Sequence, residues 1–106
     1  MEDTIKEYEG KVIELSYDWN CGNKGWCKGI IYEGQCYSVS LRDIDSSKTV
    51  IVTRIPKKYV SSVKDSRFDN RINHLELKVI EWLSAGAKSS EIDGLKVEMA
   101  RPLRED

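Results

Sequence analysis

The sequence predicts a mainly β domain of the α+β class, a small antiparallel β-barrel with a C-terminal amphipathic α-helix packed on it. Short β-rich runs separated by turn residues fill the segment from Lys11 to Val63. After Asp69 the apolar residues recur at three- and four-residue steps, the spacing of a helix. A length of 106 residues leaves room for one modest core, so we expect a single domain over residues 1–106.

The expected strands alternate apolar and polar residues, or are rich in β-branched ones. Glu33-Gly34-Gln35 predicts a tight turn, and residues 43–48 predict a polar turn. Pro56 ends a strand because proline cannot donate to a sheet ladder, and one helical turn is expected after it. The expected strands are residues 11–17, 27–32, 36–41, 49–53 and 60–63, which place the barrel at about residues 8–64.

One apolar stripe predicts a helix over residues 70–85. Asp69 or Asn70 is a suitable N-cap, and Gly86 is suited to end the helix. We expect the stripe to pack on the barrel, although a helix that lies outside and pairs with another chain through Trp82 is an alternative. Residues 88–106 are expected to form a tail or an edge strand. The stripe consists of Ile72, Leu75, Val79, Trp82 and Leu83.

Composition and charge limit which binding partners and which cellular compartment we expect. The chain is 40% hydrophobic and 33% charged with a net charge of -1, which gives no global attraction to nucleic acid or to an anionic membrane. No apolar run is long enough for a membrane span, and the acidic N-terminus does not resemble a secretory signal. The odd number of cysteines favours reduced thiols. These features predict a cytoplasmic protein that does not bind membranes.

Two short strings resemble SH3 domains. The residues from Ile55 to Val60 read Ile-Pro-Lys-Lys-Tyr-Val, which is similar to the helical turn and last strand of that family, and Tyr17-Asp18-Trp19 is similar to a string near its start. The resemblance covers residues 10–63 and implies an SH3-like barrel with a groove for proline-rich peptides. The long acidic loop of peptide-binding members is absent, and the spacing from Trp26 to Pro56 differs. The matching groove positions are Tyr17, Trp19, Pro56 and Tyr59, with Trp26 a looser match.

Two other barrel families are similar over the same segment. Residues 23–31 resemble the Lys-Gly…Gly-hydrophobic turn of KOW barrels, which contact RNA or polymerase-associated proteins. Tudor-like barrels, in which aromatic rings attract methylated lysine, are also similar, and Trp19, Trp26 and Tyr32 are the matching aromatic residues. The three families share a shape and differ in function, so the resemblance supports the fold more than any activity.

We expect a non-catalytic protein-binding module, in the role of a regulator, adaptor or inhibitor. Its predicted site is an aromatic and loop surface, and its size and Lys/Ile/Ser-rich usage suit a bacterial or phage accessory protein. No enzyme is predicted, because His74 is the single histidine and no phosphate-cradling glycine string is present. No cofactor or metal ligand is assigned. The partner-binding residues are Tyr17, Trp19, Trp26 and Tyr59.

Charge placement suggests nucleic-acid binding as the alternative. The first 20 residues hold six acidic and two basic side chains, a net charge of -4, and residues 54–74 hold six basic and two acidic ones, a net of +4. A basic segment with interleaved Tyr59 and Phe68 is typical of phosphate contact with base stacking. The two segments could also neutralise each other across the fold. The nucleic-acid candidates are Lys57, Lys58, Lys64, Arg67 and Arg71.

Cysteine spacing leaves a small zinc protein as a second alternative. Cys21, Cys27 and Cys36 with His74 supply three sulfurs and one nitrogen, but the tight Cys-x-x-Cys knuckle is absent. The competing interpretation is that Cys36, with or without Cys27, is a small buried residue and Cys21 an exposed loop thiol.

Overall fold

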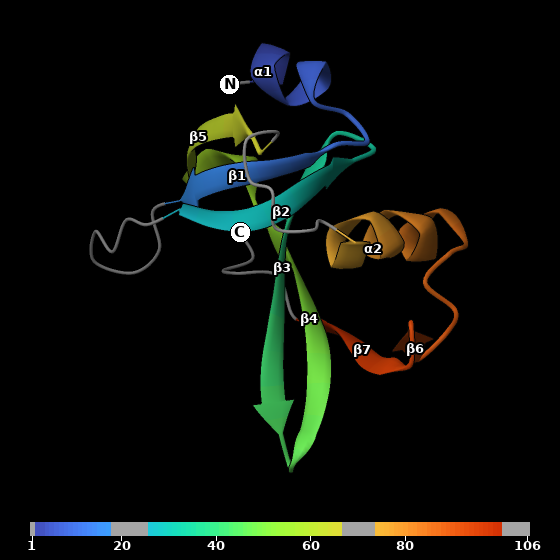
Figure 1. The fold of residues 1–106 in the computed structure, drawn as a ribbon. Coiled ribbons are helices and arrows are strands. Elements are labelled where there is room, and N and C mark those ends of the chain that lie inside the picture. Colours follow the sequence, from blue (N-terminus) through green and yellow to red (C-terminus); the bar gives the residue numbers. More distant parts are fainter. Residues whose placement is uncertain (1, 18–25, 67–73, 101–106) are drawn as a thin grey trace.

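A computed structural model describes residues 2–17, 26–66 and 74–100 of the chain. These residues form one seven-stranded sheet with two α-helices and a short 3-10 helix (Figure 1). In chain order the elements are α1 (Glu2–Glu7), β1 (Val12–Tyr17), β2 (Trp26–Tyr32), β3 (Gln35–Ile44), β4 (Ser47–Ile55), η1 (Lys57–Tyr59), β5 (Val60–Asp65), α2 (His74–Ser84), β6 (Glu91–Ile92) and β7 (Leu95–Ala100).

The strands lie in the order β5-β1-β2-β3-β4-β7-β6. Every neighbouring pair is antiparallel except β4 and β7, which run parallel after a crossover that contains α2. The prediction of a mainly β, α+β fold is confirmed. The described strands do not close on themselves, since β5 and β6 end the sheet on either side. The C-terminal strand β7 lies inside the sheet, and the two-residue β6 takes the edge.

Strands β1 and β2 are buried on both faces where Val12 pairs with Ile30. Val12 and Ile30 face α2, whereas Ile13 and Ile31, their neighbours in the chain, face the opposite side. The sheet therefore separates two cores, which explains why adjacent residues of these strands, Val12-Ile13 and Ile30-Ile31, are both apolar. The helix-side core comprises Val12, Ile30, Val39, Val50, Val52, Val79, Trp82, Ile92 and Val97. The inner core comprises Ile5, Ile13, Leu15, Ile31, Cys36, Ile55 and Val60.

The β3–β4 hairpin is longer than the sequence predicted. The polar turn expected over residues 43–48 is wrong in extent, because the strands continue to Ile44 and resume at Ser47. Only Asp45 and Ser46 form the turn, with φ angles of 50° and 66°. Positive φ at both central residues is the turn geometry that matches the twist of a two-residue hairpin. The hairpin therefore projects well beyond the body of the domain (Figure 1).

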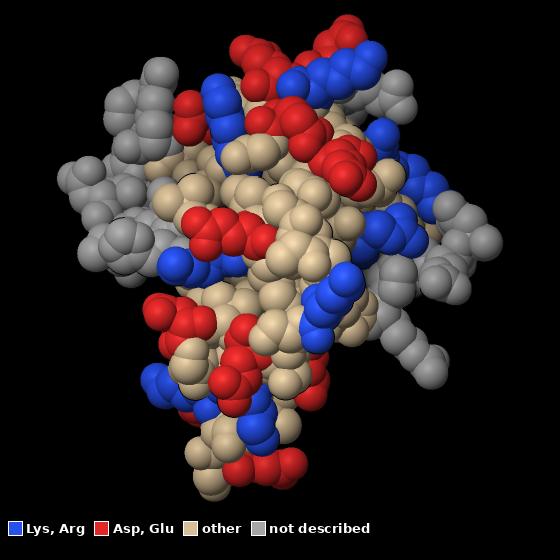
Figure 2. All heavy atoms as spheres, turned by 90° about the vertical axis from the view of Figure 1, so that its right-hand side faces the viewer, with Lys and Arg blue, Asp and Glu red and all other residues tan. Residues whose placement is uncertain are grey.

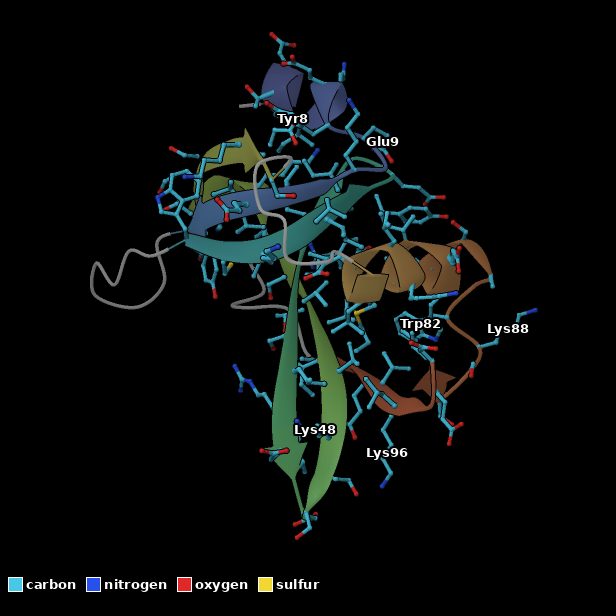
Figure 3. The ribbon with its side chains drawn as sticks, viewed as in Figure 1. Tyr8, Glu9, Lys48, Trp82, Lys88 and Lys96 are labelled. Atoms are coloured by element: carbon cyan, nitrogen blue, oxygen red, sulfur yellow. The ribbon has the colours of Figure 1, made fainter. Side chains whose placement is uncertain are left out.

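Helix α2 packs on the sheet, as the apolar stripe predicted. Val79 and Trp82 are buried in the helix-side core, and the Trp82 Nε1–H donates to the Ser89 carbonyl at 2.8 Å (Figure 3). The helix ends at Ser84, and the φ of +87° at Gly86 lets the Gly86 and Ala87 amides donate to the Leu83 and Trp82 carbonyls of the last turn. The predicted start at residue 70 lies outside the described residues. On the side that carries α2, basic and acidic side chains intermingle (Figure 2).

The N-terminal helix α1 was not predicted. Ile5 keeps 2% exposure within the inner core, and Tyr8 packs against the same core. After the helix, the two carboxylate oxygens of Glu9 accept from the backbone amides of Glu33 and Gly34 at 2.6 and 2.7 Å. These two hydrogen bonds join the segment before β1 to the β2–β3 turn. A helix of six residues is too short to show a periodic pattern in the sequence.

Gly29 is required by close packing between strands. A Cβ on Gly29 would collide with the Tyr37 carbonyl oxygen and lie 2.8 Å from Leu15 Cδ2. We expect Gly29→Ala to lower the free energy of unfolding by about 2–3 kcal/mol, because the colliding atom belongs to the backbone. Urea denaturation measures this change.

The matched control is Gly94→Ala in the β6–β7 turn, where a Cβ meets nothing within 4 Å but φ is +80°. Its expected cost is about 1 kcal/mol, from the left-handed conformation alone. Equal costs for the two variants would contradict the packing account of Gly29.

Candidate functional site

The antiparallel pairing of β5, β1 and β2 aligns two rows of side chains. One row runs Ser62–Ser16–Trp26, and the next, two residues along, runs Lys64–Glu14–Lys28. Because strand residues alternate in direction, both rows point away from the inner core, where Leu15 lies. We call this surface the Trp26 face and define it by Glu14, Ser16, Trp26, Lys28, Ser62 and Lys64.

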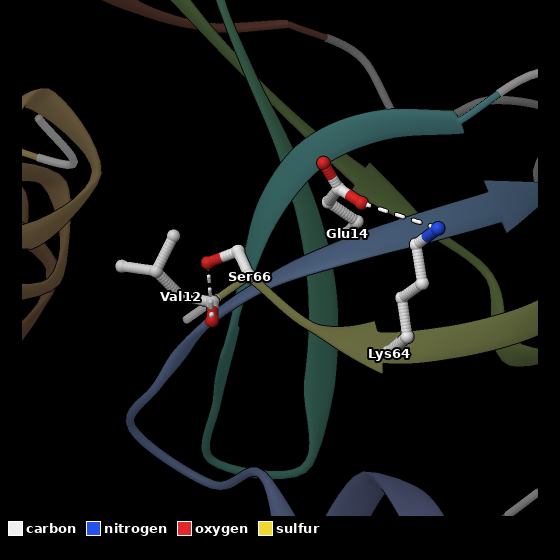
Figure 4. A network of polar contacts seen from close by, with 4 residues as sticks. All are labelled: Val12, Glu14, Lys64 and Ser66. Atoms are coloured by element: carbon white, nitrogen blue, oxygen red, sulfur yellow. Dashed lines mark hydrogen bonds and ion pairs between the residues drawn. The ribbon is translucent and has the colours of Figure 1, made fainter. Parts of the chain in front are cut away.

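Trp26 is held by its neighbours although half of it is exposed. Its side chain keeps 50% exposure, and the Lys64 Nζ lies 4.1 Å from the ring centroid. The same ammonium lies 3.5 Å from Glu14 Oε2 (Figure 4). An exposed cation–π contact is worth about 0.5–1 kcal/mol and an exposed ion pair less. These contacts orient the ring while leaving much of it accessible.

Ser16 explains how Lys64 reaches the ring. Lys64 and Trp26 lie on strands that flank β1, so their side chains must lean toward each other across it. Ser16 lies directly opposite Trp26 and is small, and it keeps 9% exposure on a face that is otherwise polar and open. A larger residue at this position would separate the ammonium from the indole.

The other predicted aromatic residues do not join Trp26. Tyr17 and Tyr59 are both half-buried and pack against the inner core. The Lys58 Nζ lies 5.2 Å from the Tyr59 ring centroid. Trp19 lies outside the described residues. The structure therefore places Tyr17 and Tyr59 against one core and Trp26 on the opposite side of the sheet.

The predicted basic set is only partly described. Lys64 is engaged with Glu14 and Trp26 on the Trp26 face. Lys57 and Lys58 belong to η1, on the connection between β4 and β5. Arg67 and Arg71 lie outside the described residues, so the proposed basic surface stays a prediction.

The two described cysteines are poor nucleophiles. Burial raises the pKa of the Cys27 thiol from 9.0 to about 11. Burial also raises the pKa of Cys36, against a smaller lowering by Lys57, and this residue is fully buried as expected. Neither is a thiolate at neutral pH, and only a thiolate attacks efficiently.

The zinc alternative stays a prediction, because one of its ligands lies outside the described residues. No group of three metal-ligating side chains occurs among the described residues. Cys21, which the zinc hypothesis needs, lies outside them, and nothing is described of the His74 side chain.

A hollow of about 240 Å³ beside β6 and β7 has no counterpart in the sequence reasoning. Lys96 and Glu91 face each other there across the β6–β7 pair. The hollow lies where β6 begins at Glu91 beside the longer β7, and no sequence motif marks such a place. Its lining residues are Ser90, Glu91, Lys96, Val97 and Glu98.

Comparison with known proteins assigns no family. No protein-family model, curated protein sequence or solved structure matches the chain. Neither helix in the described part of the chain is long and apolar enough to span a membrane.

The thiol of Cys27 gives a measurable pH dependence. Because its pKa in the folded chain is about 11, we expect alkylation by iodoacetamide at pH 8 to be about 100-fold slower than in the urea-unfolded chain. The unfolded chain also loses this proton first as the pH rises, so the free energy of unfolding falls between about pH 9 and 11.

Peptide mass spectrometry resolves labelling at Cys27 from labelling at the other cysteines. A labelling midpoint near pH 9 in the folded chain would contradict the burial of this thiol. Labelling at Cys36 provides an internal comparison and should also be slow in the folded chain, because burial raises its pKa too.

Proposed function

We propose that this chain is a non-catalytic protein-binding module and that the Trp26 face is its binding surface. The observation that carries the proposal is a half-exposed tryptophan oriented on a sheet face by a cation and a carboxylate. Tryptophan is enriched among the residues that dominate interface energies. A ring already ordered in the unbound protein loses less conformational entropy on binding.

The proposal includes the SH3-like barrel as the scaffold. Its support is the local agreement at the Ile-Pro-Lys-Lys-Tyr-Val string, where β4 ends at Ile55, η1 follows and β5 begins at Val60. Ile55 and Val60 both enter the inner core, and β5 returns to pair with β1. The cytoplasmic location, the role as regulator or inhibitor and the bacterial or phage origin belong to the same proposal.

The four predicted aromatic residues have different roles in this proposal. Trp26 is its centre, because it is the exposed large hydrophobic residue of the Trp26 face. Tyr17 and Tyr59 expose part of their side chains and are proposed as a separate contact near the inner core. Trp19 keeps its proposed role from the sequence.

Trp26→Ala tests the proposal against a matched control. Peptides are selected from a displayed random library on the immobilised full chain, and their affinities are measured by fluorescence anisotropy. We expect Trp26→Ala to weaken binding at least about tenfold, a loss typical of a central interface residue. Leu77→Ala removes an apolar side chain of similar exposure, 49%, from α2 and should leave the affinities unchanged.

A second measurement separates protein from nucleic-acid partners. The tagged chain is used to capture partners from a lysate of the encoding organism, with and without nuclease. Capture that survives nuclease and is lost with Trp26→Ala supports the proposal. Binding that needs nucleic acid, falls steeply with salt and is lost in the double variant Lys57→Glu, Lys58→Glu would replace it with the nucleic-acid alternative.

A further inference from the structure

Strand β5 ends the sheet beside the Trp26 face. Within the described residues it pairs with β1 and with no other strand, so its second edge carries no ladder partner there. Ser61, Ser62 and Lys64 are exposed along this six-residue strand. An edge of this kind can accept a further strand through its backbone groups.

The charges across the sheet specify what such a strand would carry. Lys28, Glu14 and Lys64 lie opposite one another on β2, β1 and β5, so the row alternates positive, negative, positive. Glu14 thus lies between two lysines in this row, and the last residue of the row, at the open edge, is Lys64. On an added strand, the residue opposite Lys64 would have its Cβ about 5 Å from that of Lys64. A carboxylate at that position would continue the alternation of charge, whereas a cation would be repelled by Lys64.

The row of Val63 and Leu15, on the opposite face of the sheet, indicates which residue would lie next to the acidic one on the added strand. Val63 lies opposite Leu15 and is half-buried at the margin of the inner core. The residue of an added strand opposite Val63 points to this same side, and burying an apolar side chain there removes further surface from water. The two rows together describe a segment with an acidic residue next to apolar, β-branched ones.

We propose that the β5 edge binds an extended segment of a partner protein as an added strand, with an acidic residue opposite Lys64 and an apolar residue opposite Val63. The inference rests on the proposed function, because it names the chemistry of the partner that binds beside Trp26. A second copy of this chain fits less well. The outward residues of β5 are Ser62 and Lys64, so pairing β5 with itself supplies no carboxylate to Lys64.

A charge swap between protein and peptide tests the pairing. Decapeptides are selected from a displayed random library on the full chain, and the selected peptides should carry an acidic residue beside β-branched ones. For one such peptide we expect Lys64→Glu to weaken the anisotropy-measured affinity about tenfold, since an attractive pair becomes a repulsive one. Replacing the acidic residue of the peptide with lysine should restore the affinity for Lys64→Glu.

Two controls keep the swap interpretable. Lys48→Glu reverses an exposed charge on the β3–β4 hairpin and should leave the affinity unchanged. Lys64→Gln removes the charge without adding repulsion from Glu14, and it should give a smaller loss than Lys64→Glu. The urea midpoint of each variant checks that the fold is retained.

Backbone pairing has its own signature. Successive peptide amides point to opposite edges of an added strand, so N-methylation of one alternate set should abolish binding and methylation of the other set should not. The amides of β5 should gain protection from hydrogen exchange when the peptide binds.

The outcomes separate this inference from the proposed function. Peptides that need Trp26 but ignore the Lys64 swap, or that respond equally to both methylation sets, would leave the proposed function standing and remove strand addition at β5. A dimer detected by sedimentation and abolished by Lys64→Glu would assign the edge to a second copy and overturn the inference. Restored affinity in the swap, with methylation sensitivity on one set, supports it.

Discussion

The burial of β1 and β2 on both faces around Val12 and Ile30 is the constraint on which the rest of the structure depends. Val12 and Ile13 enter different cores, and so do Ile30 and Ile31. A slip of one residue in the pairing of these strands would exchange the two sets, so the register is strongly specified. Gly29 reinforces it, because only a residue without a Cβ fits against the backbone of Tyr37.

The same two strands carry the candidate site because α2 covers only part of the face that bears Val12 and Ile30. Val12 and Ile30 lie at the end that the helix buries. Further along, on the same face, Glu14 and Trp26 stay accessible. The residue types change accordingly from aliphatic to polar with a single aromatic ring. One face of the sheet thus forms part of the core at one end and an accessible surface at the other. The packing at the buried end holds in place the strands that carry the accessible surface.

The sequence predicted what depends on local periodicity. The strand that became β1 and the stripe with Val79 and Trp82 were visible from spacing alone, whereas the six-residue α1 was too short to show a period. The Trp26 face was not visible as a unit, because Glu14, Trp26 and Lys64 meet only through the pairing of three strands. Lys64 is one of several basic residues close together in the chain, but its partner Glu14 lies 50 positions away and no local pattern connects the two.

The parallel pairing of β4 with β7 has a consequence for how the chain is made. Strand β4 is complete at residue 55, but its partner on that side ends at residue 100. During synthesis β4 is therefore an exposed edge until residues 95–100 have emerged, with Val50 and Val52 not yet covered by α2 and β7. Contacts this distant in sequence form slowly. The nascent chain is thus most prone to aggregate in the interval before β7 docks, and chaperone dependence should be concentrated there.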